Sequence, residues 1–161
     1  HFLNGINSIN GVIFGAKWFP DGKSFIIYST KQIWHYKLDE VLNGKPGRVI
    51  FEYSPSEMDY ITGAEIAPDG NRIAVFKSEY KEPDDRENRL IDIYIMDVGG
   101  NIIDTVERVF YHSTGDGFPI PLKYYWMDND TLISEGYNRQ NDEANVYKID
   151  LKQKKRYIID K

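Results

Sequence analysis

The tripeptide Gly22-Lys23-Ser24 is the first place where residue types and spacing could perform chemistry, because a phosphate-binding loop ends on these residues. Such a loop needs another glycine five positions before its last one, so that consecutive backbone N–H groups surround the phosphates. That position is Lys17, and the apolar run Phe25–Tyr28 that follows indicates a strand instead of the required helix. The sequence therefore predicts a hairpin turn here and no nucleotide-binding loop.

The segment Asp128-Asn129-Asp130 offers three oxygen ligands and resembles the start of a calcium-binding loop. The next positions of such a loop carry a further oxygen ligand and a glycine, whereas Leu132 and Ile133 stand there. Zinc prefers several nearby histidines or carboxylates, but His35 lies within an apolar run and His112 is far along the chain. We interpret the segment as a hairpin corner and expect no metal and no cofactor.

Covalent hydrolysis lacks its usual sequence signature. No Gly-x-Ser-x-Gly segment occurs, and the neighbours His112 and Ser113 would point to opposite sides of an extended chain. The chain has no cysteine, which excludes a thiol nucleophile, a disulfide and a cysteine metal site. Its 25 Asp and Glu residues leave carboxylate-based hydrolysis open, because the fold could pair any two of them.

Charge and hydropathy exclude two classes of partner. The net charge of −5 argues against a general nucleic-acid binder, which is usually basic. The one basic cluster, Lys152–Arg156, could touch phosphate or an anionic membrane surface, but such a short run is typical of a solvated turn. No apolar run approaches the length of a membrane span. We therefore expect neither nucleic-acid binding nor membrane insertion.

A repeated pattern organises the whole chain. The segment GAKWFPDGKSFIIYS, residues 15–29, is echoed by GAEIAPDGNRIAVFK, residues 63–77, and more weakly by KYYWMDNDTLISEG, residues 123–136. In the first two copies, proline and aspartate shape the turn and glycine takes its left-handed position. Each copy is followed by an apolar run ending on Asp39, Asp97 or Asp150, and then by one more β-rich run.

Each repeat therefore predicts four antiparallel strands, because β-branched and aromatic residues alternate without a sustained helical period. The fold class is all-β, with three four-stranded sheets formed by residues of about 12–54, 60–107 and 120–161 in one domain. Only the stretch Leu38–Leu42 could hold a turn of helix. The aromatic residues Trp18, Trp34 and Tyr124–Trp126 could stack on sugars or bases, but their positions favour packing within and between the sheets.

The Pro-Asp-Gly turn followed by an apolar strand, with a later strand ending on Asp, resembles the TolB-type, WD40-like β-propeller repeat. This resemblance covers nearly the whole chain from about Gly15 and implies a fold that mostly presents binding surfaces. It also resembles the propeller domains of prolyl oligopeptidase-type peptidases. The resemblance to TolB-type proteins implies an extracytoplasmic location, secreted or at the cell surface. The absence of cysteine fits an exported and a cytoplasmic protein equally.

Three blades are too few to close a ring, since closed propellers use four to eight. The chain begins at His1 without an initiator methionine, which we interpret as a piece of a longer protein. The alternatives are an open arc of three sheets or a homodimer that pairs through exposed edge strands.

The irregular segments are predicted to gather at one end of the sheets. In an up-and-down sheet, the second turn of each repeat shares an end with the connection to the next repeat, which places residues 80–89, 137–144, 54–59 and 111–118 together. The candidate ligand-binding residues at this end are Tyr80, Asp84, Asp85, Arg86, Arg89, His112, Asp116, Tyr137 and Arg139. The alternative is that these loops are only solvated insertions, because residues 81–89 mix four acids with three bases.

These observations predict a non-catalytic binding module that recognises a protein or peptide through its irregular-loop end. The alternative is the propeller domain of a prolyl oligopeptidase-type hydrolase whose catalytic domain lies outside this sequence, or a small carboxylate-based hydrolase.

Overall fold

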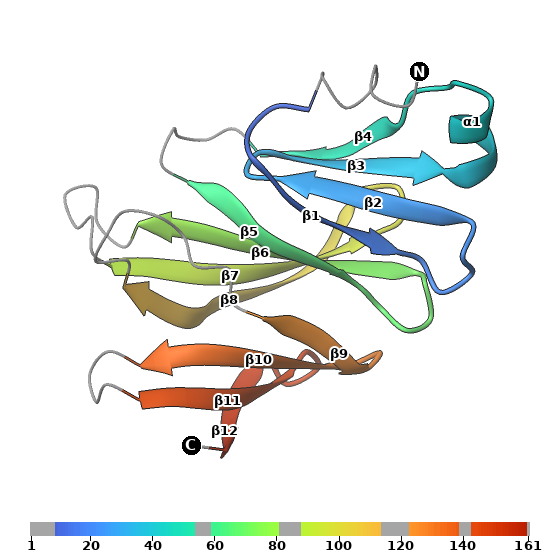
Figure 1. Ribbon diagram of the computed structural model, residues 1–161. Coiled ribbons are helices and arrows are strands. Elements are labelled where there is room, and N and C mark those ends of the chain that lie inside the picture. The colour runs from blue at the N-terminus through green and yellow to red at the C-terminus, as the bar shows by residue number, and fades with distance from the viewer. Residues whose placement is uncertain (1–8, 54–58, 81–87, 114–122, 139–142, 161) are drawn as a thin grey trace.

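The computed structural model describes residues 9–53, 59–80, 88–113, 123–138 and 143–160. Within these ranges the chain forms three antiparallel sheets whose strands follow one another in sequence order (Figure 1). Sheet 1 contains β1 (Ile13–Trp18), β2 (Ser24–Ser29), β3 (Gln32–Lys37) and β4 (Arg48–Glu52). Sheet 2 contains β5 (Tyr60–Ile66), β6 (Arg72–Tyr80), β7 (Asn88–Asp97) and β8 (Ile102–Ser113). Sheet 3 contains β9 (Tyr124–Asp128), β10 (Thr131–Asn138), β11 (Glu143–Asp150) and β12 (Lys155–Asp160).

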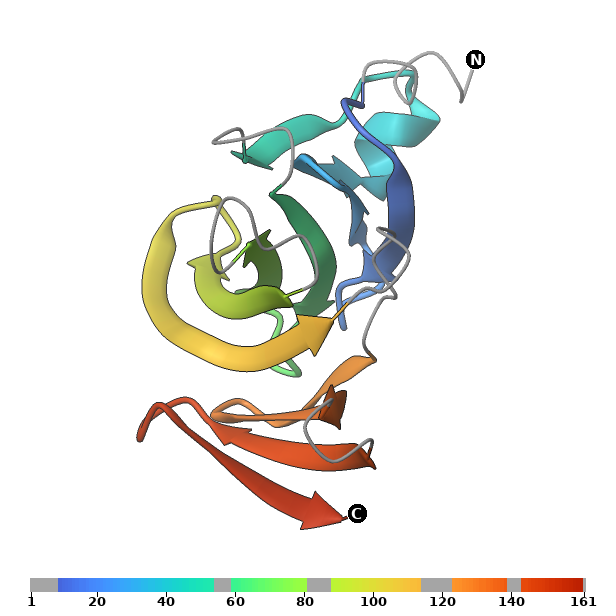
Figure 2. The same cartoon turned by 90° about the vertical axis from the view of Figure 1, so that its left-hand side faces the viewer.

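The predicted all-β class and the three four-stranded sheets are confirmed. The short helix α1 (Leu38–Leu42) forms where the sequence allowed one helical turn. Its C-cap residue is Asn43, and Gly44 follows with a φ of +75°, a conformation that ends a helix easily because glycine has no Cβ. Figure 2 shows the three sheets stacked one after another.

The Pro-Asp-Gly turns have the geometry that the sequence predicts. The Gly22 N–H donates to the Phe19 carbonyl over 3.0 Å, and the Lys23 N–H donates to Asp21 Oδ1 over 2.8 Å. The φ of Gly22 is +65° and that of Gly70 is +71°. The second turn repeats both kinds of hydrogen bond. In each turn the aspartate side chain accepts the backbone N–H two residues further on and so stabilises the turn.

Two apolar clusters lie between the sheets. Ile26, Ile33 and Ile50 of sheet 1 pack against Ile73 and Val75 of sheet 2. On the other side of sheet 2, Phe76 and Ile93 belong to a cluster with Tyr124, Leu132 and Ile149 of sheet 3. Neighbouring residues of a strand point to opposite faces, so Val75 and Phe76 serve the two different clusters.

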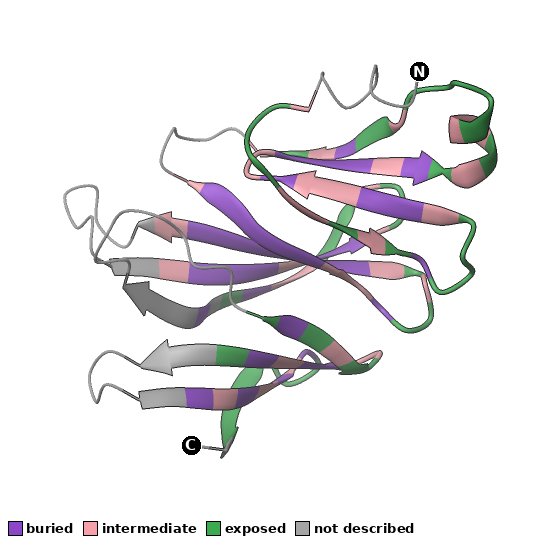
Figure 3. Ribbon diagram, in the orientation of Figure 1, coloured by how far each residue is buried: buried purple, intermediate pink, exposed green. Residues whose placement is uncertain are grey.

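Sheet 2 is consequently buried on both faces, as the concentration of buried residues on β5, β6 and β7 in Figure 3 shows. The rings of Phe76 and Tyr124 stack across the interface with their centroids 3.3 Å apart and their planes 9° from parallel. The Trp126 indole N–H donates to the Glu65 carbonyl over 3.0 Å, which adds a polar link between sheets 2 and 3.

The outer faces of sheets 1 and 3 are only partly covered. Trp34 and Tyr124 are buried as predicted, and Trp126 packs against the cluster between sheets 2 and 3. Trp18 is 56% exposed, although its ring packs against Phe25 of the same sheet at a centroid distance of 4.8 Å. The packing prediction is wrong for Tyr125, which is 43% exposed. Both lie on the faces of the terminal sheets that no other described sheet covers.

Replacing Gly22 or Gly70 by valine should lower the free energy of unfolding by about 1 kcal/mol or more, because a β-branched residue fits a positive φ badly. At Gly22 an added Cβ meets no atom within 4 Å, so the loss there reports backbone strain alone. Asparagine tolerates this conformation and should cost less at either position. Urea denaturation of the four variants measures the difference, and valine variants as stable as the original chain would disprove the turn assignment.

Replacing Ile93 by alanine should destabilise the chain by about 2–5 kcal/mol, because the side chain is fully buried and leaves a cavity between sheets 2 and 3. The matched control is Ile103→Ala on the neighbouring strand β8, where the isoleucine is 55% exposed, and it should change stability far less. Equal losses in thermal denaturation would contradict a buried face at Ile93.

Candidate functional site

The directions of the strands give the molecule two distinct ends. Strands β6, β8 and β10 finish at the left of Figure 1, which we call the loop end, and the Pro-Asp-Gly turns lie at the right, which we call the turn end. This division follows from strictly sequential antiparallel pairing, because every second strand runs in the same direction.

The structure describes four of the nine predicted binding residues. Tyr80 is the last residue of β6, Arg89 lies in β7, His112 in β8 and Tyr137 in β10. The sequence placed these four in loops, and that placement is wrong. Cross-strand pairing extends β7 back to Asn88 and β8 on to Ser113, beyond the apolar core of each run. The other five, Asp84, Asp85, Arg86, Asp116 and Arg139, lie outside the described residues.

Three of the four described residues come together. In the register of sheet 2, Tyr80 is opposite Arg89, and Arg89 is opposite His112. They therefore form one row across three strands at the loop end, with adjacent strands about 4.8 Å apart. Tyr137 belongs to sheet 3 and is opposite Ala144, so it is not part of the row.

A buried ion cluster lies between sheets 1 and 2 near the loop end. Lys77 is 7% exposed, and its Nζ lies 2.7 Å from Glu79 Oε2 and 3.4 Å from Asp92 Oδ2. The same ammonium group lies 5.5 Å from the ring centroid of Tyr53 and 5.4 Å from that of Tyr94, within the range of cation–π attraction. Lys77 is three residues before Tyr80, so the cluster supports the strand that carries the row.

The electrostatics of this cluster favour the charged lysine. Burial by itself would lower the pKa of Lys77, but the hydrogen bond to Glu79 and the neighbouring tyrosine hydroxyls outweigh burial and raise it. Burial also raises the pKa of Tyr53 to about 12, although the nearby lysine opposes that shift. Lys77 is therefore protonated and the Tyr53 phenol is neutral at neutral pH.

Sequence reasoning missed this cluster. The signal was a lysine inside the apolar strand RIAVFKSEY and an aspartate inside the apolar strand IDIYIMD, which register pairs directly. A charged side chain in the middle of a buried strand requires a partner of opposite charge. Lys77 of β6 and Asp92 of β7 are partners for each other.

The turn end is held together by polar contacts between sheets. The Asp69 N–H donates to Asn129 Oδ1 over 3.2 Å, and the Arg72 guanidinium donates to the Asn129 carbonyl. The Asp130 N–H donates to Asp128 Oδ1 over 2.8 Å, so the segment that resembled a calcium loop is a hairpin corner, as predicted. Among the residues that the structure describes, no group of three His, Asp or Glu side chains could hold a metal ion.

The basic cluster Lys152–Arg156 is largely engaged within the molecule. Lys152 pairs with Asp130 over 2.7 Å, Lys154 pairs with Asp104 of sheet 2, and Arg156 donates to the Val109 carbonyl of sheet 2. The contacts of Lys154 and Arg156 join sheet 3 to sheet 2, whereas that of Lys152 lies within sheet 3, so the cluster is more than a solvated turn. Among the described residues, no helix is long and apolar enough to cross a bilayer.

A pocket of about 300 Å³ opens where the first strands of the three sheets meet. Lys17 of β1 and Glu65 of β5 form an ion pair of 2.5 Å in its wall. Burial raises the pKa of Glu65, although Lys17 opposes the shift. Because Lys17 and Glu65 pair with each other, these two groups offer no unpaired charge to a ligand in the pocket.

Comparison with solved structures identifies the fold. The chain is similar to a protein described as TolB from Agrobacterium tumefaciens, with 17% identity and a TM-score of 0.60 over 95% of this chain and 47% of that one. It is similar to an acylaminoacyl peptidase of Pyrococcus horikoshii, with 15% identity and a TM-score of 0.59 over 91% of this chain and 24% of that one. The β-propeller domain of the Trilobed protease from Pyrococcus furiosus, which has an open velcro topology, matches with 13% identity and a TM-score of 0.54 over 92% and 43%.

The three sheets are therefore blades of β-propeller type, and the predicted resemblance to TolB and related propellers is confirmed at the level of fold. The chain spans less than half the length of each of these three proteins. No protein-family model matches the sequence. No curated protein matches it either.

Replacing Lys77 by methionine should lower the free energy of unfolding by about 3–5 kcal/mol, because Glu79 and Asp92 would lose the cation between them. The control is Lys45→Met, since Lys45 is exposed and its loss should change stability by no more than about 0.5 kcal/mol. Chemical denaturation compares the two variants. A Lys77→Met variant as stable as the control would show that the cluster contributes nothing.

Proposed function

We propose that this chain is a non-catalytic binding module of β-propeller type that recognises a protein or peptide at its loop end. The observation that carries the proposal is the row Tyr80–Arg89–His112, which the register of sheet 2 assembles from three strands. Tyrosine and arginine are enriched in the residues that dominate binding energy at protein interfaces. By residue type, these three adjacent positions bring a phenol, a guanidinium and an imidazole to one row of the sheet.

The surroundings of the row support the same proposal. The described part of sheet 2 is the most buried of the three sheets, and a well-packed scaffold loses little entropy when a partner binds. The residues Asp84, Asp85, Arg86, Asp116 and Arg139 belong by sequence to the segments that connect these strands, and we include them, with Tyr137, in the proposed surface. Their mixed charges suit a partner with charges of both signs.

A protein or peptide fits this surface better than a nucleic acid. The chain has a net charge of −5, and the basic residues Lys152, Lys154 and Arg156 are engaged within the molecule. The TolB-like fold supports an extracytoplasmic module, and we include that location in the proposal. The similarity to two peptidase chains concerns the fold alone and does not favour the hydrolase alternative.

The test is selection of binding peptides from a random library, followed by titration with variants of the chain. Replacing Tyr80, Arg89 and His112 together by alanine should weaken the selected peptides at least about tenfold, since each truncated anchor costs about 1 kcal/mol or more. The control replaces the exposed Asn71 and Val98 at the turn end of the same sheet by alanine and should leave the affinity unchanged.

Melting temperatures measured in parallel separate loss of binding from loss of fold. Peptides that bind the triple variant normally, or that lose affinity only for the control variant, would place recognition elsewhere. If no peptide is selected and the chain forms a dimer in sedimentation, its partner is a second copy that pairs through the edge strands, and the proposed peptide site is wrong.

A further inference from the structure

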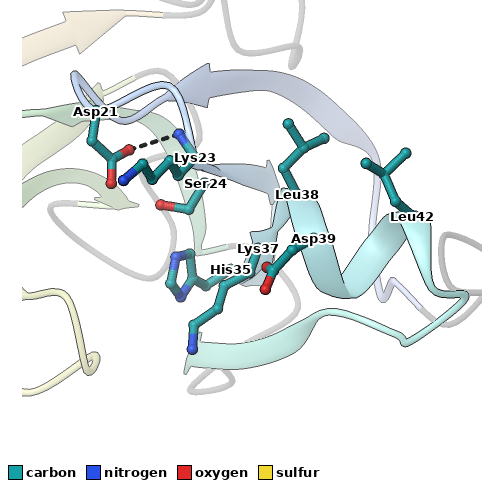
Figure 4. A pocket seen from close by; sticks show the side chains of 8 residues that line it. All are labelled: Asp21, Lys23, Ser24, His35, Lys37, Leu38, Asp39 and Leu42. Atoms are coloured by element: carbon teal, nitrogen blue, oxygen red, sulfur yellow. Dashed lines mark hydrogen bonds between the residues drawn. The ribbon is translucent and has the colours of Figure 1, made fainter.

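A pocket of about 490 Å³ lies at the turn end of sheet 1, on the side of the molecule opposite to the proposed peptide surface (Figure 4). Its volume falls in the range that holds small organic molecules. The first Pro-Asp-Gly turn, strands β2 and β3 and the helix α1 supply its wall, which consists of Asp21, Lys23, Ser24, His35, Lys37, Leu38, Asp39 and Leu42.

Two lysines in this wall have free charges. Within the described part of the chain, neither the Lys23 nor the Lys37 ammonium group has an ion-pair partner, in contrast to Lys17, Lys77 and Lys154. Ser24 directly follows Lys23 in the chain, and the register of β2 and β3 places Ser24 opposite Lys37. The serine hydroxyl therefore belongs to the residue that is adjacent to both lysines. Lysines with no partner can hold an anion without first breaking an ion pair.

An imidazole with an unused nitrogen lies beside them. His35 Nε2 is buried and has no hydrogen-bond partner, while the ring packs edge-on against Phe19 at a centroid distance of 5.3 Å. Buried polar atoms in proteins nearly always have a partner, so this nitrogen calls for one. A ligand oxygen in the pocket would supply it.

The local field at His35 is positive. Burial is the largest cause that lowers the pKa of His35, and the positive charges of Arg48 and Lys37 lower it further. The opposing influence of Glu40 and Asp21 is smaller. The charged and titratable groups around this ring are Asp21 and Lys23 from the turn, Lys37 from β3, Asp39 and Glu40 from α1, and Arg48 from β4.

We propose that this pocket binds a small organic monocarboxylate, whose carboxylate lies between Lys23 and Lys37 and accepts a hydrogen bond from His35 Nε2. The apolar body of the ligand lies against Leu38 and Leu42, which Figure 4 shows on the helix that borders the pocket. Asp21 Oδ1 already accepts the Lys23 N–H, and together with Asp39 it limits the positive charge of the wall. A single negative charge therefore fits better than a polyanion.

The ligand and a proton should bind together. A carboxylate beside His35 favours the imidazolium, so the pKa of His35 rises on binding and the complex takes up a proton. Affinity should therefore increase as the pH falls through the pKa of His35 in the complex, as long as the ligand itself stays ionised.

The experiment is an NMR titration of the whole chain with N-acetyl-leucine. The control ligand is N-acetyl-leucinamide, which has the same apolar body but no charge. The carboxylate should shift the resonances of His35, Ser24 and Lys37 and raise the pKa of His35, and the amide should do neither. Lys23→Gln and Lys37→Gln should each weaken the carboxylate by roughly tenfold. Lys45→Gln is the control, because Lys45 is an exposed lysine that is not part of this wall, and it should bind as the original chain does.

Equal binding of the amide and the carboxylate would overturn the proposal, as would unchanged affinity in both glutamine variants. Inorganic phosphate and acetate serve as further probes. If either binds as tightly as N-acetyl-leucine, the pocket is a simple anion site with no role for Leu38 and Leu42, and the proposal is wrong. The Tyr80, Arg89 and His112 triple variant should bind the carboxylate normally, so failure here is distinguishable from failure of the peptide surface.

Discussion

Strands β5, β6 and β7 of sheet 2 are buried on both faces, one against sheet 1 and the other against sheet 3. This double burial explains why β6 and β7 are apolar almost without alternation: residues on either side of the strand enter a core. The polar side chains that remain in these strands need partners within the protein, and Lys77 and Asp92 meet this need by forming an ion pair.

The two ends of the sheets are built by different means. At the turn end, side chains of Asp21, Asp69 and Asp128 each accept a backbone N–H two residues on, which makes the corners short and stiff. The contacts of Asn129 with the neighbouring corner then join sheets 2 and 3. A stiff corner also positions Lys23 beside α1, so the pocket there depends on the same turn chemistry that defines the repeat.

The parts of the fold that depend on local chemistry could be predicted from the sequence. The positive φ of Gly22 and Gly70 follows from the residues of the turn itself, and the three sheets follow from its repetition. Strand ends were harder, because Arg89 and His112 extend their strands by pairing with neighbours that are distant in sequence. For the same reason the row at the loop end could be predicted as a set of residues near one end, but not as neighbours in register.

The features that could not be predicted from the sequence are those that depend on tertiary packing. Lys23 and His35 stand in a turn and in mid-strand, and only the placement of α1 beside them forms a pocket. The exposure of Trp18 was missed because its strand position is equivalent to that of Trp126, which does pack against a neighbouring sheet. Equivalent positions of a repeat have different environments at the end of a stack, because burial depends on the next sheet as well as on the strand.

The placement of the three tryptophans also determines how the intrinsic fluorescence of the chain responds to unfolding. Trp18 and Trp34 belong to sheet 1, one exposed and one buried, and Trp126 belongs to sheet 3 at its contact with sheet 2. Sheet 2 contains none. Indole emission shifts to longer wavelength as the ring meets water, so separation of sheet 3 from sheet 2 changes the Trp126 contribution while Trp34 stays blue-shifted within sheet 1. The intrinsic fluorescence of the chain therefore distinguishes loss of one terminal blade from loss of the other.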